Sequence, residues 1–166
     1  MRENVRDRDR LEHIVEAIDR ILAFADGKTK EEMEADDLKY YGIVKNIEII
    51  GEATYMLTRT FCAQHTETPW EFIAKMRHVL VHDYYQIEPR EVWKVIRDDL
   101  RPLRNQVAGY LANTDWAEWE KNEVAITETA AHKTLMQTAR RMKKDGMATQ
   151  QISRYTGLTA EEIDVL

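Results

Sequence analysis

The sequence contains little cysteine, proline or glycine. Its 166 residues include one cysteine, Cys62, three prolines and six glycines. A single cysteine excludes a disulfide framework within the chain and a cysteine-rich zinc site. The scarcity of proline and glycine argues against a turn-rich all-β fold and favours long helices. A reducing compartment, the cytoplasm, is therefore the expected location.

Long apolar runs are also missing. The sequence has no stretch of about 18 apolar residues, so we expect no membrane-spanning helix and no membrane partner. The opening letters MRENVRDRDR are not followed by an apolar segment, so they do not fit the pattern of a secretory signal peptide. Apolar residues still make up 43% of the chain, which is enough to close a core around helices.

An excess of positive charge is the third feature that is lacking. The formal net charge is −6, and the sequence has no basic tail. Proteins that coat nucleic acid gain their affinity by neutralising many phosphates, which requires a basic face. The composition therefore disfavours a nucleic-acid scaffold, but it leaves room for a small site that handles a single phosphate.

The spacing of apolar residues predicts four long helices. Apolar residues recur at three- and four-residue steps over 11–25, over 43–61 and over 92–110. The remaining helix is predicted from the letters TPWE, in which Thr68 would cap the helix and Glu71 would complete a capping box.

Together these helices predict an all-α fold. Four helices joined by short links form an antiparallel four-helix bundle, which we assign to residues 1–112. Pro102 lies inside the fourth helix, where it should remove one backbone hydrogen bond and bend the helix.

The pattern changes over residues 113–166, which we interpret as a helical C-terminal extension of unknown role. The segment ends with two short helices around Thr156-Gly157-Leu158, and this resembles the turn of a helix-turn-helix. The second of these helices is acidic, whereas a helix that reads DNA needs basic or amide side chains. We therefore favour a packing appendage over a DNA-binding element.

The third helix carries the candidate site. Successive residues of a helix are about 100° apart around its axis, so the residues can be assigned to two sides. One side is predicted to face the core, and the other side lies opposite. The first comprises Phe72, Ile73, Met76, Val79 and Leu80, and the second comprises Lys75, His78, His82 and Tyr85, with Arg77 at its margin. A continued helix would aim Asp83 into the apolar side, so regular helix should end near His82.

Three interpretations of this helix end are open from the residues alone. It could be a solvated surface with two histidines. It could bind a metal ion through His78 and His82, although the sequence offers no further ligand in a familiar pattern. It could also carry acid–base chemistry on a phosphodiester, with His82 moving protons and Arg77 holding the phosphate. Arg77 and His82 are about 140° apart on an ideal helix, and three geometries could bring them to one substrate. The long Arg77 side chain could reach around, the helix could distort near its end, or a second protomer could supply the partner.

The letters RHVLVHDY (77–84) match R-x-x-x-x-H-x-Y, the signature of HEPN-domain ribonucleases. Three further stretches occur in the order and spacing of one branch of that family: NIEIIGEA (46–53), PWEFIAKMRHVLVHDYY (69–85) and VWKVIRDDLRPL (92–103). Over roughly residues 5–112 the chain resembles the HepT-like toxins of toxin–antitoxin pairs. Several matching blocks are far more specific than one short motif.

This resemblance implies a homodimeric endoribonuclease that cuts RNA without a metal or another cofactor. Arg77 and His82 match the catalytic pair, and Tyr84 matches the tyrosine that a minimal nucleotidyltransferase antitoxin adenylylates in this family. The chain departs from the family at His78, where a small polar residue is usual. His78 could be an auxiliary donor, a second proton carrier or a mark of changed substrate preference.

Two other functions compete with this interpretation. The chain could be a non-catalytic helical module that binds a nucleotide or a partner. It could also serve only as the substrate of a partner transferase. The presence of both Arg77 and His82 favours the enzyme, and only RNA cleavage that is lost on His82→Ala separates the alternatives.

Overall fold

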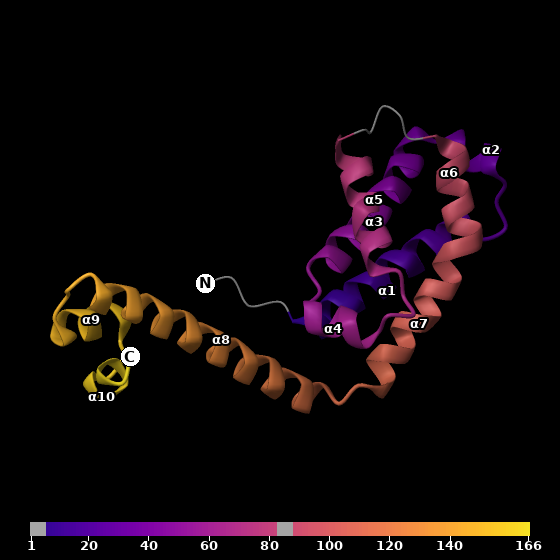
Figure 1. Cartoon of the computed structure of the whole chain (residues 1–166). Coiled ribbons are helices and arrows are strands. Elements are labelled where there is room, and N and C mark those ends of the chain that lie inside the picture. The colour runs from indigo at the N-terminus through magenta and orange to yellow at the C-terminus, as the bar shows by residue number, and fades with distance from the viewer. Residues whose placement is uncertain (1–5, 83–87) are drawn as a thin grey trace. The chain divides into compact units, whose positions relative to one another are not determined.

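The computed structural model describes residues 6–82 and 88–166, without the side chains of residues 78–82 and 127. The described residues form helices and no strand, so the predicted all-α class is confirmed. The chain divides into two compact units, residues 1–114 and residues 115–166 (Figure 1). None of the described helices is long and apolar enough to cross a membrane.

The first unit is built around α1 (Asp7–Ala25), which packs against both α3 (Asp37–Tyr55) and α7 (Leu100–Asn113). On its other side, α3 packs against α5 (Trp70–His82). The shorter elements of this unit are α2 (Lys30–Glu34), α4 (Arg59–Gln64), α6 (Pro89–Lys94) and the π-helical segment η2 (Val95–Asp99). Along the apolar stripe predicted over 11–25, Leu11, Ile14 and Ile18 are completely buried. The rest of that stripe is only partly buried.

The prediction for the second helix is wrong at its C-terminal end. The apolar stripe over 43–61 suggested one helix, but α3 ends at Tyr55 and a separate helix, α4, begins at Arg59. The Thr58 hydroxyl caps α4 by accepting a hydrogen bond from the Phe61 N–H at 3.2 Å. Buried Asp7 holds the same threonine, accepting from its N–H at 2.8 Å and from its hydroxyl at 2.6 Å. This contact, 51 positions away in sequence, stabilises a break that local periodicity does not reveal.

The start of α5 also differs from the prediction. The Thr68 hydroxyl points to Tyr110 at 2.6 Å, and the Glu71 carboxylate pairs with Lys75 at 2.7 Å, so the predicted capping box does not form. Phe72, predicted to face the core, is 67% exposed. Trp70 takes the buried position at this end of the helix, and Phe72, about 200° further around the axis, therefore faces outward.

The distortion predicted at Pro102 appears one turn before it. Helix α6 passes into the π-helical segment η2, in which the Leu100 N–H donates to the Val95 carbonyl five residues back. A proline ring clashes with the carbonyl four residues earlier, which here belongs to Asp98. The wider π turn ends at that point and lets α7 continue through Pro102.

The second unit consists of α8 (Trp116–Lys144), α9 (Thr149–Thr156) and α10 (Ala160–Asp164). The two short helices predicted here are confirmed, with Gly157 at a φ of 73° between them and a Thr159–Glu162 capping box on the second. The unit has its own small core, formed by Ala139, Ile152, Leu158 and Ile163.

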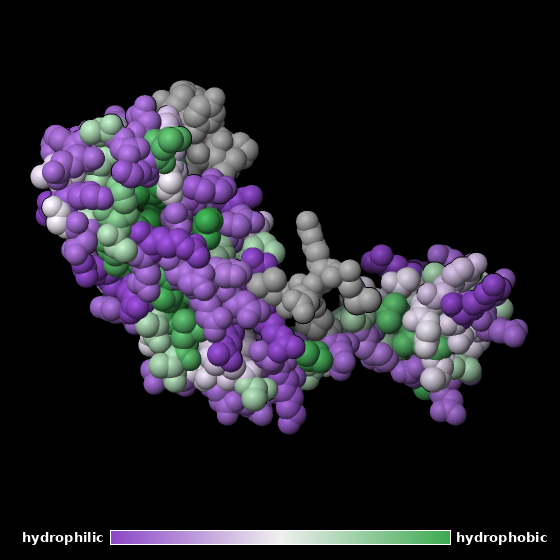
Figure 2. All heavy atoms as spheres, turned by 180° about the vertical axis from the view of Figure 1, so that it is seen from behind, coloured by the Kyte–Doolittle hydropathy of each residue, from purple (hydrophilic) through white to green (hydrophobic). Residues whose placement is uncertain are grey.

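The surface is mostly hydrophilic on the face shown in Figure 2, and hydrophobic residues appear there in separate small patches. Among the exposed large apolar residues of the first unit are Leu38, Tyr41, Tyr55, Met56 and Phe72. Single exposed apolar residues are normal on soluble proteins. Tyr55 is different because its ring lies next to Arg77, a residue of the candidate site.

Candidate active site

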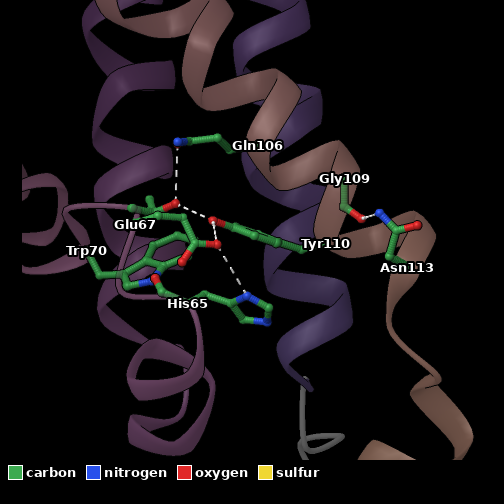
Figure 3. A network of polar contacts seen from close by, with 8 residues as sticks. His65, Glu67, Trp70, Gln106, Gly109, Tyr110 and Asn113 are labelled. Atoms are coloured by element: carbon green, nitrogen blue, oxygen red, sulfur yellow. Dashed lines mark hydrogen bonds and ion pairs between the residues drawn. The ribbon is translucent and has the colours of Figure 1, made fainter.

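A polar and aromatic cluster joins Tyr110 of α7 to the segment that leads into α5 (Figure 3). The Tyr110 hydroxyl donates to Glu67 Oε1 at 2.8 Å and lies 2.6 Å from the hydroxyl of buried Thr68. The Tyr110 ring packs against His65 with centroids 4.2 Å apart. Trp70 donates its indole N–H to the His65 carbonyl at 2.7 Å. These contacts fix where α5 begins.

Two ionisable groups of this cluster, Tyr110 and Glu67, have pKa values shifted in opposite directions. Burial raises the pKa of the Tyr110 phenol. A hydrogen bond from its own backbone N–H lowers the pKa of Glu67, and the Tyr110 hydroxyl lowers it further. At neutral pH the cluster therefore pairs a neutral phenol with a carboxylate, an arrangement that suits a fixed structural contact.

Two turns into α5, Arg77 lies directly against α3 at Gly51. A Cβ built on Gly51 would lie 2.9 Å from the Cβ of Arg77 and 3.1 Å from its backbone nitrogen. Distances this short are not sustained between side chains and backbone, so only glycine allows the two helices to approach here. The residue that approaches Gly51 is therefore the arginine of the R-x-x-x-x-H-x-Y motif.

The Arg77 guanidinium is held between two residues of α3. Its Nε contacts Oε2 of Glu52 in an ion pair. Its carbon lies 5.7 Å from the centre of the Tyr55 ring, within the range of a cation–π contact. Glu52 and Tyr55 are three positions apart and so lie on one face of α3. The Arg77 side chain is 42% exposed, so the cation is oriented and still reachable from solvent.

The other predicted site residues are described less fully. His78 and His82 lie on α5, with side chains outside the described part of the structure. Tyr84 lies in 83–87 and is therefore outside the described residues, as is the predicted disruption of the helix at Asp83. Among the described side chains, no group of three His, Cys, Asp or Glu could hold a metal ion.

A half-exposed, pre-oriented arginine suits the binding of one phosphate. Its planar fork can donate several hydrogen bonds to phosphate oxygens, and its charge does not titrate at accessible pH. The chemistry that this corner of the molecule can perform is therefore stabilisation of negative charge on a phosphodiester.

A comparison with protein families also indicates a protein that acts on phosphodiesters. The family model described as "Ribonuclease HepT-like" matches residues 14–109, which include Arg77 and His82 and lie within the first unit. This match covers more than half of the chain. The chain belongs to the HepT-like ribonucleases, a family of RNA-cleaving nucleases.

Individual relatives carry related names. A protein of Thermococcus cleftensis named "Probable ribonuclease HepT" is 33% identical over 99 residues, covering 60% of this chain and 90% of the relative. "Putative RNase TTE0752" of Caldanaerobacter subterraneus subsp. tengcongensis is 33% identical over 97 residues, covering 58% of this chain and 87% of the relative.

A third relative has an additional activity in its name. "Gamma-glutamylcyclotransferase and putative RNase MJ0434" of Methanocaldococcus jannaschii is 27% identical over 135 residues, covering 81% of this chain and 61% of the relative. No solved structure matches the chain at a significant level. The second unit, residues 115–166, lies outside the residues that the family model matches.

Sequence reasoning found Arg77 but missed Glu52. The two are 25 positions apart, and nothing in the R-x-x-x-x-H-x-Y motif points to an acidic partner. The available signal was the adjacent letters Gly51-Glu52 in NIEIIGEA, since a residue next to a close helix contact lies near whatever makes that contact.

Proposed function

We propose that this chain is a metal-independent endoribonuclease toxin of a toxin–antitoxin pair and acts as a homodimer. The observation that carries the proposal is the HepT-like family match across the segment that contains Arg77 and His82. The half-exposed guanidinium of Arg77, held on α3, supports it.

In the proposed reaction the RNA supplies its own nucleophile. His82 takes the proton from a ribose 2′-hydroxyl as the 2′-oxygen attacks the adjacent phosphorus. Arg77 stabilises the negative charge that develops on the phosphoryl oxygens. The bond from phosphorus to the 5′-oxygen breaks, and a proton is returned to that oxygen. The products are a 2′,3′-cyclic phosphate and a 5′-hydroxyl.

The spacing of the pair supports a homodimer. His82 is five residues beyond Arg77, so on an ideal helix the two side chains point about 140° apart. A two-fold axis near the end of α5 would place an arginine and a histidine from each protomer in one cleft.

Tyr84 is proposed as the point of control. A minimal nucleotidyltransferase antitoxin would transfer AMP from ATP to the Tyr84 hydroxyl, releasing pyrophosphate. The attached phosphate would compete for Arg77, and the nucleotide would fill the cleft. His78 is proposed as an auxiliary donor to RNA.

The test is to map new RNA 5′ ends in growing cells after induction of the wild-type chain, His82→Ala and Tyr84→Phe. Wild type and Tyr84→Phe should both create new 5′-hydroxyl ends, and only Tyr84→Phe should continue to do so when the partner transferase is co-expressed. If His82→Ala creates the same ends as wild type, the catalytic assignment is wrong. If co-expression silences Tyr84→Phe as well, the control site is wrong.

A further inference from the structure

We propose that Glu52 is a positioning residue for the nuclease site: it holds the Arg77 guanidinium through Nε, so that the two terminal nitrogens serve the RNA phosphate. This inference rests on the proposed function, because it assigns a role within the same site. Glu52 lies outside the R-x-x-x-x-H-x-Y motif and on a different helix from Arg77.

The first support is the way in which the pair is made. The carboxylate contacts Nε, the guanidinium nitrogen nearest the side-chain stem. A contact there fixes the plane of the guanidinium and leaves its far edge, with both Nη groups, for a second anion. Arginine commonly binds phosphate through two parallel N–H groups, so this half of the fork is sufficient.

The second support is the burial of one carboxylate oxygen. The Glu52 side chain as a whole is 43% exposed, yet its Oε2 atom is inaccessible to solvent, and its ion-pair partner is Arg77. With Arg77 in place this charged oxygen is shielded from water, and the guanidinium is the charge that compensates it. Glu52 therefore favours the conformation in which the guanidinium stays against α3.

The third support is the close packing of α3 against α5 around Arg77. Gly51 brings the Arg77 backbone against α3, and Glu52 is the next residue along that helix. Tyr55 adds its ring on the same face, 5.7 Å from the guanidinium carbon. Backbone approach, charge and aromatic ring all act on one side chain, whereas the neighbouring pairs on these helices involve single contacts.

A purely structural role explains these features less well. Ion pairs between half-exposed side chains contribute little to folding stability. Orientation, in contrast, has a large effect on rates, since a misplacement of about 1 Å can cost about a hundredfold in catalysis. Glu52 should therefore matter more for turnover than for folding.

The experiment measures kcat and KM for cleavage of a model RNA by the full chain carrying Glu52→Ala, Glu52→Asp or Glu52→Gln. We expect Glu52→Ala and Glu52→Asp to lower kcat by about tenfold to a hundredfold, because neither side chain reaches Nε with the right geometry. Glu52→Gln keeps an oxygen that accepts the Nε hydrogen bond, so it should recover most of the turnover. Its KM should not rise, since it removes a negative charge next to the RNA.

The matched control is Glu48→Ala. Glu48 lies one turn earlier on α3 and pairs with Lys45 at 2.8 Å. This variant should retain wild-type kcat and KM. Thermal unfolding of every variant provides the second measurement, and Glu52→Asp should unfold within a few degrees of wild type while its turnover falls.

The outcomes separate this inference from the proposed function. Arg77→Ala serves as the reference: if wild type does not cleave, or if Arg77→Ala cleaves as well as wild type, the proposed function fails. If Arg77→Ala is inactive but Glu52→Ala turns over at or above the wild-type rate, only the positioning role is overturned. It is also overturned if Glu52→Gln is as impaired as Glu52→Ala, or if the loss of activity follows the loss of thermal stability.

Discussion

Gly51 determines how closely Arg77 can approach α3. An added methyl group would lie 2.9 Å from the Arg77 Cβ and 3.3 Å from its Cα, and neither atom belongs to the flexible end of a side chain. Gly42, on the same helix, has no atom within 4 Å of such a methyl group. The two glycines thus allow the effect of close approach to be separated from that of helix propensity.

We predict that Gly51→Ala lowers RNA cleavage by shifting Arg77 away from α3. Overpacking at a contact of this kind costs about 1–3 kcal/mol. Gly42→Ala should leave activity unchanged and raise the free energy of unfolding by up to about 1 kcal/mol, because alanine is the better helix former. Denaturant unfolding and cleavage rates of both variants test this. Equal activity and stability in the two variants would show that the approach at Gly51 is not important.

Asp19 of α1 provides a pH-dependent link to α7. Arg104 donates to its two carboxylate oxygens from Nε at 2.7 Å and from Nη2 at 3.1 Å. The hydrogen bond from Arg104 lowers the pKa of Asp19 below 3.8. A lowered pKa in the folded state stabilises the fold above the unfolded-state pKa, and this contribution is lost as the pH falls through the folded-state pKa.

We predict that Asp19→Asn lowers the free energy of unfolding at pH 7 by less than about 1 kcal/mol, since both side chains are more than a third exposed. The difference from wild type should persist down to about pH 4 and shrink below it. Urea unfolding at a series of pH values measures it. Glu16→Gln, which breaks the more exposed Glu16–Arg20 pair within α1, is the control and should have a smaller effect at pH 7. A difference that grows on acidification would contradict the assignment.

The segment between α4 and α5 is held to α7 chiefly by one phenol. The Tyr110 hydroxyl serves both Glu67 and the buried Thr68. The hydroxyl of Tyr40, in contrast, is buried without a hydrogen-bond partner, and burial raises its pKa. The two tyrosines thus differ in whether the hydroxyl group has a hydrogen-bond partner. This difference determines how much stability is lost when the hydroxyl group is removed.

We predict that Tyr110→Phe lowers the free energy of unfolding by about 1–3 kcal/mol, because the buried Thr68 hydroxyl loses its closest partner. Tyr40→Phe should be neutral or slightly stabilising, since it removes a polar group that nothing satisfies. Chemical denaturation of both variants is the measurement. If Tyr40→Phe proves the more destabilising of the two, the importance of the Tyr110 contacts has been overestimated.

Periodicity predicted the helices well where neighbouring residues determine them. It identified Leu11, Ile14 and Ile18 of α1 as core residues, although Ala17 and Ile21 are buried as well. It failed at Thr58, because Leu57 and Phe61 are buried at helical spacing even though the chain turns between α3 and α4.

The errors in the predicted site have the same physical origin. The motif identified Arg77 because Arg77 is part of a local pattern. The partner of Arg77, Glu52, and the anchor of α5, Tyr110, come from other helices and become neighbours only through packing. Contacts across long sequence separations of this kind are set by the tertiary fold, which local patterns do not encode.

The chain as a whole combines a family domain with an additional unit. The family match ends at residue 109, and the first compact unit ends at Thr114. The second unit buries only a small core of its own. The family match thus lies entirely within the first unit.

We predict that a chain shortened to residues 1–114 remains helical, unfolds cooperatively and cleaves RNA within a few-fold of the full-length rate. Circular dichroism, thermal unfolding and cleavage of the same RNA measure this. The matched control is Ile152→Ala in the full chain, which disrupts the core of the second unit and should likewise leave cleavage intact. Loss of activity in both, with the first unit still folded, would mean that the second unit takes part in catalysis.

The central claim is that His82 and Arg77 cleave RNA through the 2′-hydroxyl without a metal ion. The most direct measurement incubates the purified chain, with EDTA present, with an RNA oligonucleotide and with the same oligonucleotide carrying a single 2′-deoxy nucleotide at the cleaved position. We expect wild type to cut only the all-RNA substrate, leaving a 2′,3′-cyclic phosphate and a 5′-hydroxyl, and His82→Ala to cut neither. Cleavage that EDTA abolishes and zinc or manganese restores, or cleavage at the 2′-deoxy position, would contradict the claim.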